Sequence, residues 1–240
     1  MKYILNNPTE KQINSIKKLG LCIYRDFECI YVDVPEINDR DLPDGLIDLG
    51  LSVKWASCNI GADKPYEYGK LFQFGRADGY YYNDFNHKFY VGSDTPITTS
   101  GKTYAKGEVL GTADDAAYVA TNGKLRMPTV EEIDELLSGT TNQWCQCNIL
   151  NGKHTNNYIS GRLFISKKNH EAKIFIPAAG NFSGADCSFI DAGFSGDIWS
   201  SSVYNNNIGY TYNIYFNSCG CFRYYRTRYY GFSVRGVMSA

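Results

Sequence analysis

The chain has 240 residues, of which 43% are hydrophobic, and a formal net charge of −1 at pH 7. This length can bury the core of one large domain, alone or with a small appendage. The near-neutral charge excludes the broad basic surface of a nucleic-acid-binding protein, and no apolar run approaches the roughly 18 residues that span a bilayer. Residues 1–8 lack the apolar segment of a secretory signal, so we expect the chain to be made and folded in the cytoplasm.

Residues 1–43 are predicted to form a small N-terminal strand-helix-hairpin module. Asn7-Pro8 supplies a helix N-cap followed by proline at the first helical position, and Gly20 stands where that helix should end. Two short strands are predicted within residues 21–34, and a polar linker over residues 35–43. A unit of this size buries little surface by itself. We therefore expect it to serve attachment or oligomerisation.

Residues 44–240 are predicted to form the main domain. Aromatic and apolar residues predict strands at 48–56 and 68–75, and a long polar stretch predicts a loop at 80–103. Two apolar runs, 162–165 and 173–177, are separated by a polar turn and predict a β-hairpin.

Two helices are predicted between these strands. Asp114 to Ala120 begins with acidic residues, which the positive end of a helix dipole favours, and Asn122-Gly123 follows as a stop. Thr129 and Glu132 have the spacing of a capping box ahead of a second helix. Strands before and after central helices predict the α+β class.

Eight cysteines are spread along the chain, and their spacing does not indicate a metal site. Cys145 and Cys147 are separated by one residue, as are Cys219 and Cys221, whereas paired zinc ligands are usually separated by two or more. A chain of this length in a reducing compartment needs no disulfide framework. We predict no metal ligands and no cofactor. The other cysteines are Cys22, Cys29, Cys58 and Cys187.

The most informative segment lies between Val203 and Tyr230. It holds eight of the 20 tyrosines, five asparagines and three arginines, but no Lys, Asp, Glu, Gln, His, Met or Trp. Average usage would place about seven charged residues in a segment of this length. Antibody recognition loops have a similar composition, because Tyr gives a large contact area at low entropic cost and Ser, Gly and Asn give adaptable hydrogen bonds. The alternative is a Tyr-rich twisted sheet, since Tyr also favours strands.

Alternation within this segment predicts which side chains face the core. Ile214 and Phe216 alternate with polar and tyrosine residues, so both should lie on one side of a strand. Phe222 and Phe232 are further core candidates. Because Tyr favours half-buried strands, we expect about a third of the tyrosines in the segment to be core residues.

Six motifs in order resemble a large paralogous domain family common in Bacteroidetes, over about residues 46 to 238. That family has a C-type-lectin-like fold, related to the scaffold of the formylglycine-generating enzyme. The resemblance implies the same fold for residues 44–240 and leaves residues 1–43 outside it. The motifs are Asp48 to Ala56, Asp115-Ala116-Ala117, Leu125 to Thr129 with Glu131-Glu132, Ile176 to Gly180, Trp199-Ser200-Ser201 and Gly231 to Arg235.

Within this family, the segment resembles the variable region of a protein diversified by a retroelement, here spanning about residues 199–235. Such systems copy a template while randomising its adenines. Asn codons randomised in this way yield Asn, Tyr, Ser, Cys, Arg, Asp, Gly, Thr and others, but never Lys, Glu, Gln, Met or Trp. All of the excluded types are absent between Val203 and Tyr230, whereas the absence of Asp and His is not explained by the codons. The resemblance implies variable positions on one exposed face and fixed residues pointing into the core.

The predicted ligand-binding residues are the outward positions of this region. Arg228 and Arg235 match fixed motif positions and are expected to be structural. The predicted contact residues are Tyr204, Asn205, Asn206, Asn207, Tyr210, Tyr212, Asn213, Tyr215, Asn217, Cys219, Cys221, Arg223, Tyr224, Tyr225, Arg226, Tyr229 and Tyr230.

Three other functions were weighed against ligand binding by a diversified surface. An oxidase like the formylglycine-generating enzyme needs an accessible reactive cysteine pair, and Cys219 and Cys221 lie inside the segment that resembles a randomised one. No catalytic residues are predicted, because the three histidines share no motif with a nucleophile or a carboxylate. A calcium-dependent lectin would carry Glu-Pro-Asn or Gln-Pro-Asp, and neither occurs. A structural or adhesive paralogue without diversification is the remaining alternative.

The expected partner is a variable protein or glycan ligand on a cell surface, with neither nucleic acid nor membrane as a partner. The expected setting is a phage tail or a bacterial surface structure. Residues 1–43 would join the chain to copies of itself or to a larger assembly.

Overall fold

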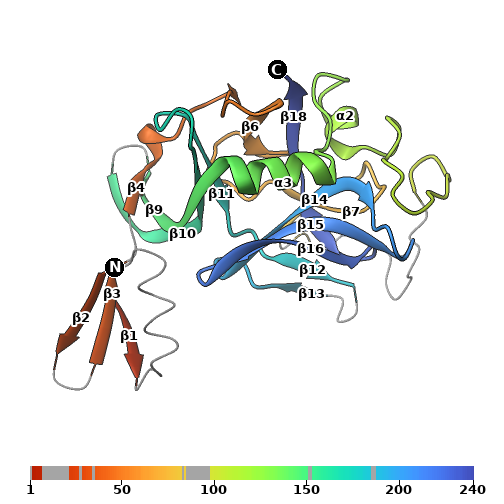
Figure 1. The fold of residues 1–240 in the computed structure, drawn as a ribbon. Helices are drawn as coiled ribbons and strands as arrows, with labels where there is room; N and C mark the ends of the chain where they lie inside the picture. Colours follow the sequence, from red (N-terminus) through yellow and green to blue (C-terminus); the bar gives the residue numbers. More distant parts are fainter. Residues whose placement is uncertain are drawn as a thin grey trace.

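The computed structural model describes residues 2–6, 22–26, 29–33, 36–82, 84, 98–150, 153–184 and 188–240. About 46% of the chain is in strands and 10% in helices (Figure 1). The predicted α+β class is therefore wrong, because the architecture is sheet-rich with few helices. This content does not exclude the C-type-lectin-like fold, which stays a prediction. Within the described ranges, no helix is long and apolar enough to cross a membrane.

The first three strands form a sheet of their own. It is antiparallel, with β3 (Cys29–Asp33) between β1 (Lys2–Asn6) and β2 (Cys22–Asp26). The two strands expected within residues 21–34 are confirmed. The helix expected between Asn7 and Gly20 lies outside the described residues.

A four-stranded sheet includes the predicted hairpin. Arg162 pairs with Ile176 in the antiparallel register of β10 and β11, which confirms that prediction. The segment predicted as a linker, residues 35–43, contains a strand that pairs in parallel with β9, followed by a 3-10 turn at Asp39–Asp41. In spatial order the strands are β11 (Lys173–Pro177), β10 (Lys153–Ser166), β9 (Thr140–Leu150) and β4 (Glu36–Asn38).

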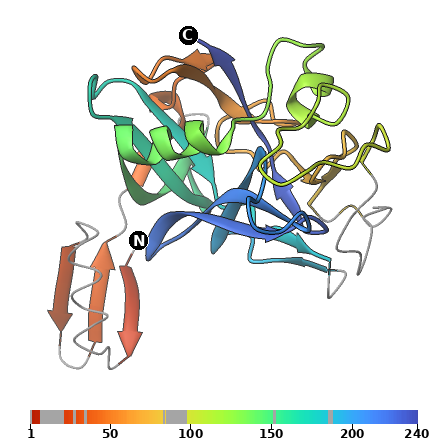
Figure 2. The same ribbon diagram turned by 45° about the vertical axis from the view of Figure 1, so that its right-hand side comes forward.

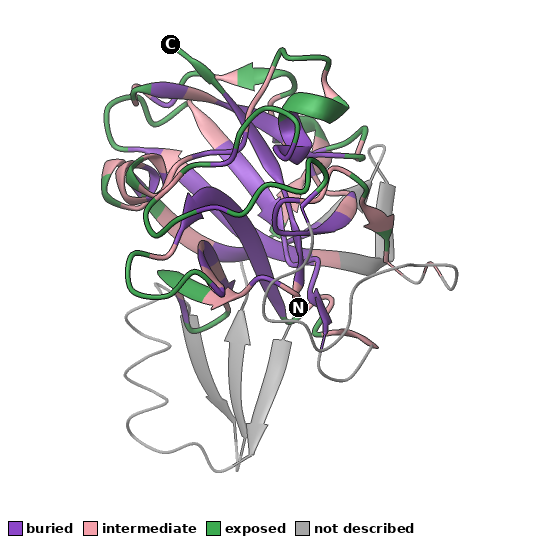
Figure 3. Ribbon diagram, turned by 90° about the vertical axis from the view of Figure 1, so that its right-hand side faces the viewer, coloured by how far each residue is buried: buried purple, intermediate pink, exposed green. Residues whose placement is uncertain are grey.

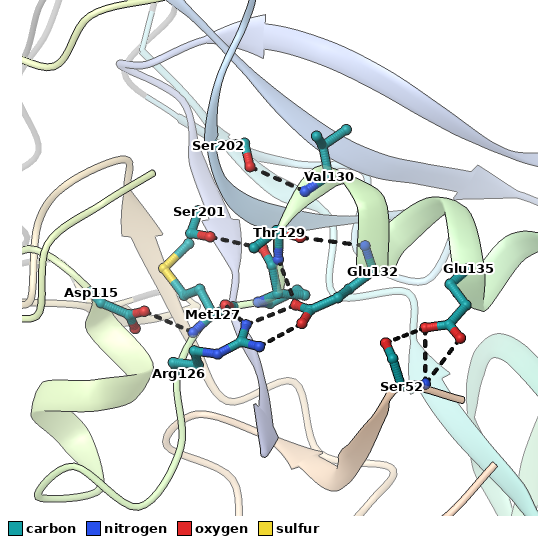
Figure 4. Close-up of polar contacts among 11 residues, drawn as sticks. Ser52, Asp115, Arg126, Met127, Thr129, Val130, Glu132, Glu135, Ser201 and Ser202 are labelled. Carbon is teal, nitrogen blue, oxygen red and sulfur yellow. Dashed lines mark hydrogen bonds and ion pairs between the residues drawn. The ribbon is translucent and has the colours of Figure 1, made fainter. Parts of the chain in front are cut away.

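Both predicted helices are present. Helix α2 (Ala116–Ala120) begins after Asp115, whose side chain accepts from the backbone N–H of Tyr118 at 2.9 Å, and ends at Asn122 and Gly123, both with positive φ. Helix α3 (Val130–Gly139) has the full capping box. The carboxylate of Glu132 accepts from the N–H of Thr129 at 2.8 Å and also binds the guanidinium of Arg126 (Figure 4).

A small antiparallel sheet joins the two ends of the main domain. It has β6 (Val53–Asn59) between β5 (Leu46–Ile47) and β18 (Arg235–Ser239). The strand predicted at 48–56 starts five residues late, because Gly50 adopts a φ of +70° and makes a turn closed by the side chain of Asp48. Strand β7 (Lys70–Gln73) confirms the strand predicted at 68–75. Within the predicted loop 80–103, a short strand β8 (Tyr80–Tyr81) pairs with β7.

The largest sheet contains the tyrosine-rich segment. Strand β14 lies beside β17 in parallel and beside β15 in antiparallel orientation, and β16 is the last strand on that side. All nine residues of β14 are buried. Buried residues gather in the interior of the main domain (Figure 3). The path runs through β13 (Ser188–Ile190), β12 (Asn181–Ser183), β17 (Gly231–Ser233), β14 (Ser195–Val203), β15 (Tyr210–Asn217) and β16 (Gly220–Thr227), with β7 attached to β17.

Candidate ligand-binding surface

The β15–β16 hairpin is built on a buried support. Trp199 of β14 is fully buried and its indole N–H donates to the carbonyl of Phe72 at 2.8 Å, which ties β14 to β7. The next residues of β14 hold the start of α3: Ser201 N–H donates to Pro128 O at 2.7 Å, and Val130 N–H donates to Ser202 Oγ at 3.1 Å (Figure 4). The motif that begins at Trp199 and the motif that ends at Thr129 are thus hydrogen-bonded through β14, the strand that pairs with the hairpin.

One face of the hairpin packs against helix α3, which lies across β14, β15 and β16 (Figures 1 and 2). Residues directly opposite each other in an antiparallel pair share a face. Ile214 of β15 lies opposite Ile198 of β14, and Phe216 lies opposite Gly196, whose missing Cβ leaves room for the phenyl ring. Both Ile214 and Phe216 are buried, which confirms their prediction as core residues.

Two predictions for this hairpin are wrong. Asn213, predicted as a contact residue, is fully buried on the opposite face and donates to the carboxyl of Asp197 at 2.7 Å. Phe222, predicted as a core residue, is 55% exposed, and its ring lies over Gly220 on β16, the last strand on that side of the sheet. Phe232 is buried as predicted.

The eight tyrosines of the segment form two groups of contacting rings, one of six and the pair Tyr229 and Tyr230, which together we call the tyrosine network. None of them is buried, so the expectation that about a third are core residues is wrong. Tyr225 is the centre: it stacks on Tyr204 at 4.3 Å between ring centroids and on Tyr224 at 5.4 Å, and meets Tyr210 edge-on at 5.8 Å. The members are Tyr204, Tyr210, Tyr212, Tyr215, Tyr224, Tyr225, Tyr229 and Tyr230.

Two arginines are part of this surface. Arg226 joins its two halves, because its guanidinium lies 4.9 Å from the ring centroid of Tyr224 and 6.0 Å from that of Tyr230. Arg223 lies 5.6 Å from the centroid of Tyr212 and forms an ion pair with Asp134 of helix α3. The network is therefore a mixed aromatic and cationic surface that extends around the hairpin, rather than a single flat face.

The loop before the hairpin adds three exposed amides. Asn205, Asn206 and Asn207 are exposed, and the amide of Asn206 donates to the hydroxyl of Tyr204 at 3.1 Å. The side chain of Asn207 accepts from Gly209 N–H at 2.8 Å and so shapes the loop. Asn205 and Asn206 are the residues of this loop with side chains best placed for a ligand.

The hairpin tip carries the two predicted cysteines. The side chain of Asn217 accepts from the N–H groups of Cys219 at 2.8 Å and Gly220 at 3.1 Å, so this half-buried residue shapes the turn. Cys219 is exposed and Cys221 is half-buried, and both are free thiols. Burial raises the pKa of Cys221 to about 12, against the opposing charge of Arg162, so its thiol is protonated at neutral pH.

Three side chains, two from distant strands and one from the segment itself, donate hydrogen bonds to backbone carbonyls of the segment. The guanidinium of Arg162 in β10 donates two hydrogen bonds to Asn217 O, Gln73 Nε2 in β7 donates to Tyr229 O at 2.7 Å, and Arg228 Nη1 donates to Ile208 O at 3.4 Å. Arg228 and Arg235 are both buried, as expected of structural residues. Every residue type has a backbone carbonyl, so these bonds do not depend on the side chains at positions 208, 217 and 229.

Sequence reasoning missed Arg162, Asp134 and Asp197, which lie outside the segment and reach it only in the folded chain. Burial raises the pKa of Asp197 to about 8, while the charge of Arg226 and the hydrogen bond from Asn213 oppose the shift. The carboxyl of Asp197 is therefore mostly protonated at neutral pH. Across the described ranges, no group of three or more His, Cys, Asp or Glu side chains could hold a metal ion.

Comparisons of the chain with protein-family models, with curated proteins and with solved structures gave no match.

Proposed function

We propose that this chain is a non-enzymatic ligand-binding protein, and that a retroelement diversifies the surface it presents on the β15–β16 hairpin and the preceding loop. The observation that supports the proposal most strongly is the tyrosine network. Eight tyrosines and two arginines lie at the surface without a buried member among the tyrosines. Tyr and Arg are the side chains that dominate binding energy in protein interfaces.

The pattern of burial supports the coding argument. Side chains that randomised Asn codons can produce occupy most of the exposed and half-buried positions, whereas the buried exceptions are Gly209, Thr211, Asn213, Gly220 and Arg228. The apolar residues Ile214 and Phe216 are buried among them. A template that leaves these two codons unchanged would keep the core while the surface varies.

Tolerance to replacement also follows from the way the backbone is held. Exposed substitutions usually change stability by no more than about 0.5 kcal/mol. Here the framework side chains Arg162 and Gln73 contact backbone carbonyls of the segment, so side-chain exchange does not remove these bonds. Stability and ligand specificity are thus carried by different atoms.

An oxidase related to the formylglycine-generating enzyme is disfavoured by the cysteines. A reactive thiolate needs a lowered pKa and access to solvent. Burial instead raises the pKa of both Cys145 and Cys221 to about 12. We propose binding rather than catalysis for this surface, and attachment or oligomerisation for residues 1–43, within a phage tail or a bacterial surface structure.

Two experiments test the proposal. Sequencing the locus should reveal a reverse transcriptase and a template repeat that differs from the gene at adenines; a locus lacking both would favour a structural paralogue. Replacing Tyr224, Tyr225, Tyr229 and Tyr230 with Ala should abolish ligand binding and leave the melting temperature almost unchanged. A large loss of stability would contradict the separation of fold from binding.

A further inference from the structure

The guanidinium of Arg226 lies at the surface without an ion pair. Arg223 forms an ion pair with Asp134, and Arg76, outside the tyrosine network, forms one with Asp78. The side chain of Arg226 forms no ion pair or hydrogen bond with the residues that the structure describes, and its guanidinium contacts Tyr224 and Tyr230 instead. Its donor groups are therefore free for a ligand.

Among the residues that the structure describes, no acidic group forms an ion pair with Arg226. The segment from Val203 to Tyr230 has no Asp or Glu. Asp197 interacts electrostatically with Arg226, but it is buried beneath the surface and burial raises its pKa to about 8, so it is mostly neutral. The surface is thus positive where Arg226 lies, and its charge complements an anion.

The packing of the rings distinguishes between possible anionic ligands. Tyr224 packs in parallel against Tyr225, and Tyr229 packs against Tyr230 with an interplanar angle of 22°. Arg226 lies over both Tyr224 and Tyr230, so these rings already have partners from the chain itself. A sugar would need an open ring face to stack on, whereas a protein surface can use ring edges, hydroxyl groups and adaptable polar contacts.

We propose that Arg226 is the anchor for a carboxylate side chain, Asp or Glu, on the surface of a protein ligand, with Tyr224 and Tyr230 holding its guanidinium in position. This inference rests on the proposed ligand-binding function and specifies the ligand's chemistry. The planar guanidinium can bind a carboxylate through two parallel hydrogen bonds, and its contacts with the two rings restrict its orientation before binding.

The test uses the full chain on an array of synthetic peptides of varied sequence. Each acidic peptide has a counterpart in which Asn replaces Asp and Gln replaces Glu. We expect the binders to be enriched in acidic residues, and each amide counterpart to bind about tenfold more weakly or worse, as for a lost charge-assisted hydrogen bond. Arg226→Gln should abolish this difference, while Arg76→Gln, which removes the same charge outside the network, should preserve it.

Several results would overturn the inference. They are equal binding of acidic and amide peptides, an acid preference that survives Arg226→Gln, the absence of any peptide binder, and binding confined to carboxylated glycans on a parallel glycan array. Thermal denaturation of Arg226→Gln checks that the variant is folded. Peptide binding without acid preference would leave the proposed function intact, and the locus sequence and the four-tyrosine variant test that function separately.

Discussion

The side chain of Arg162 donates two hydrogen bonds, at 3.3 and 3.0 Å, to the backbone carbonyl of Asn217. Arg162 is 2% exposed, and its third contact is the side chain of Asn142 in the neighbouring strand β9. A buried guanidinium thus connects the four-stranded sheet to the tip of the β15–β16 hairpin through a backbone carbonyl and not through a side chain of the hairpin. This contact makes the hairpin part of the rigid framework.

Replacing Arg162 with Met should destabilise the protein. The apolar side chain fills similar space but leaves the carbonyl of Asn217 without its donor, and an unsatisfied buried group costs about 1–3 kcal/mol. Chemical denaturation measures the change, and hydrogen exchange at residues 217–221 should become faster. Asn217→Ser keeps the backbone carbonyl and should cost less; an equal or larger loss in Asn217→Ser would show that the side chain, not the carbonyl, holds the tip.

Asn213 should behave as a structural residue, unlike the exposed asparagines predicted alongside it. Asn213→Ala removes the buried hydrogen bond to Asp197 and should lower the free energy of unfolding by about 1–3 kcal/mol. Asn206→Ala alters an exposed side chain and should stay within about 0.5 kcal/mol of the parent. Urea denaturation of the two variants distinguishes them, and equal stabilities would mean that Asn213 is not buried in solution.

The two phenylalanines of the hairpin should respond in opposite ways to truncation. Phe216→Ala removes a fully buried ring and should cost about 3–5 kcal/mol. Phe222→Ala removes an exposed ring and should change the free energy of unfolding by no more than about 0.5 kcal/mol. A strongly destabilised Phe222→Ala variant would restore the sequence-based prediction that this ring belongs to the core.

Asp197 should make the folded state less stable as the pH rises. Its pKa is near 3.8 without the fold and is raised to about 8 by burial. The folded state therefore binds more protons between these values, and the stability contributed by Asp197 is complete below pH 4 and is lost as the pH rises through 8. Melting temperatures measured from pH 5 to 9 should fall.

Asp197→Asn provides the comparison for this pH dependence. The variant cannot ionise and should lose the part of the decline that Asp197 causes, whereas exposed Asp63→Asn should retain it. Burial is the main cause of the raised pKa, which the charge of Arg226 opposes and that of Asp191 increases. Parallel pH profiles for the parent and Asp197→Asn would contradict the assignment.

The sequence correctly predicted those helix ends and turns that depend on residues close together in the chain. The capping box at Thr129, the stop at Asn122-Gly123 and the hairpin of β10 and β11 all depend on residues close in the chain. The alternation of Ile214 and Phe216 identified their buried face for the same reason.

The α+β prediction failed because many strands have no alternating pattern to detect. Strands β4, β5, β8, β12, β13 and β17 have only two or three residues, and their neighbours in the sheet come from distant parts of the chain.

The exposure of the tyrosines, and the identity of the residues that contact the hairpin, could be learned only from the folded structure. Composition could not tell that β16 is the last strand of its sheet, and this position is what leaves its tyrosines at the surface. Arg162 carries no recognisable motif, because its role depends on a carbonyl 55 residues away. The residue types therefore predicted a tyrosine-rich surface, and the order of the strands determines which residues are exposed on it.

The tyrosine network also limits how a repertoire of such proteins could vary. Each of its rings touches another, with Tyr225 touching three. Residues in contact do not contribute independently. Exchanging Tyr225 would release Tyr204, Tyr210 and Tyr224 to adopt new orientations, so a single codon change alters the shape offered by its neighbours. Related binders should then differ by correlated groups of substitutions, and the effect of one mutation on affinity should depend strongly on the background in which it is made.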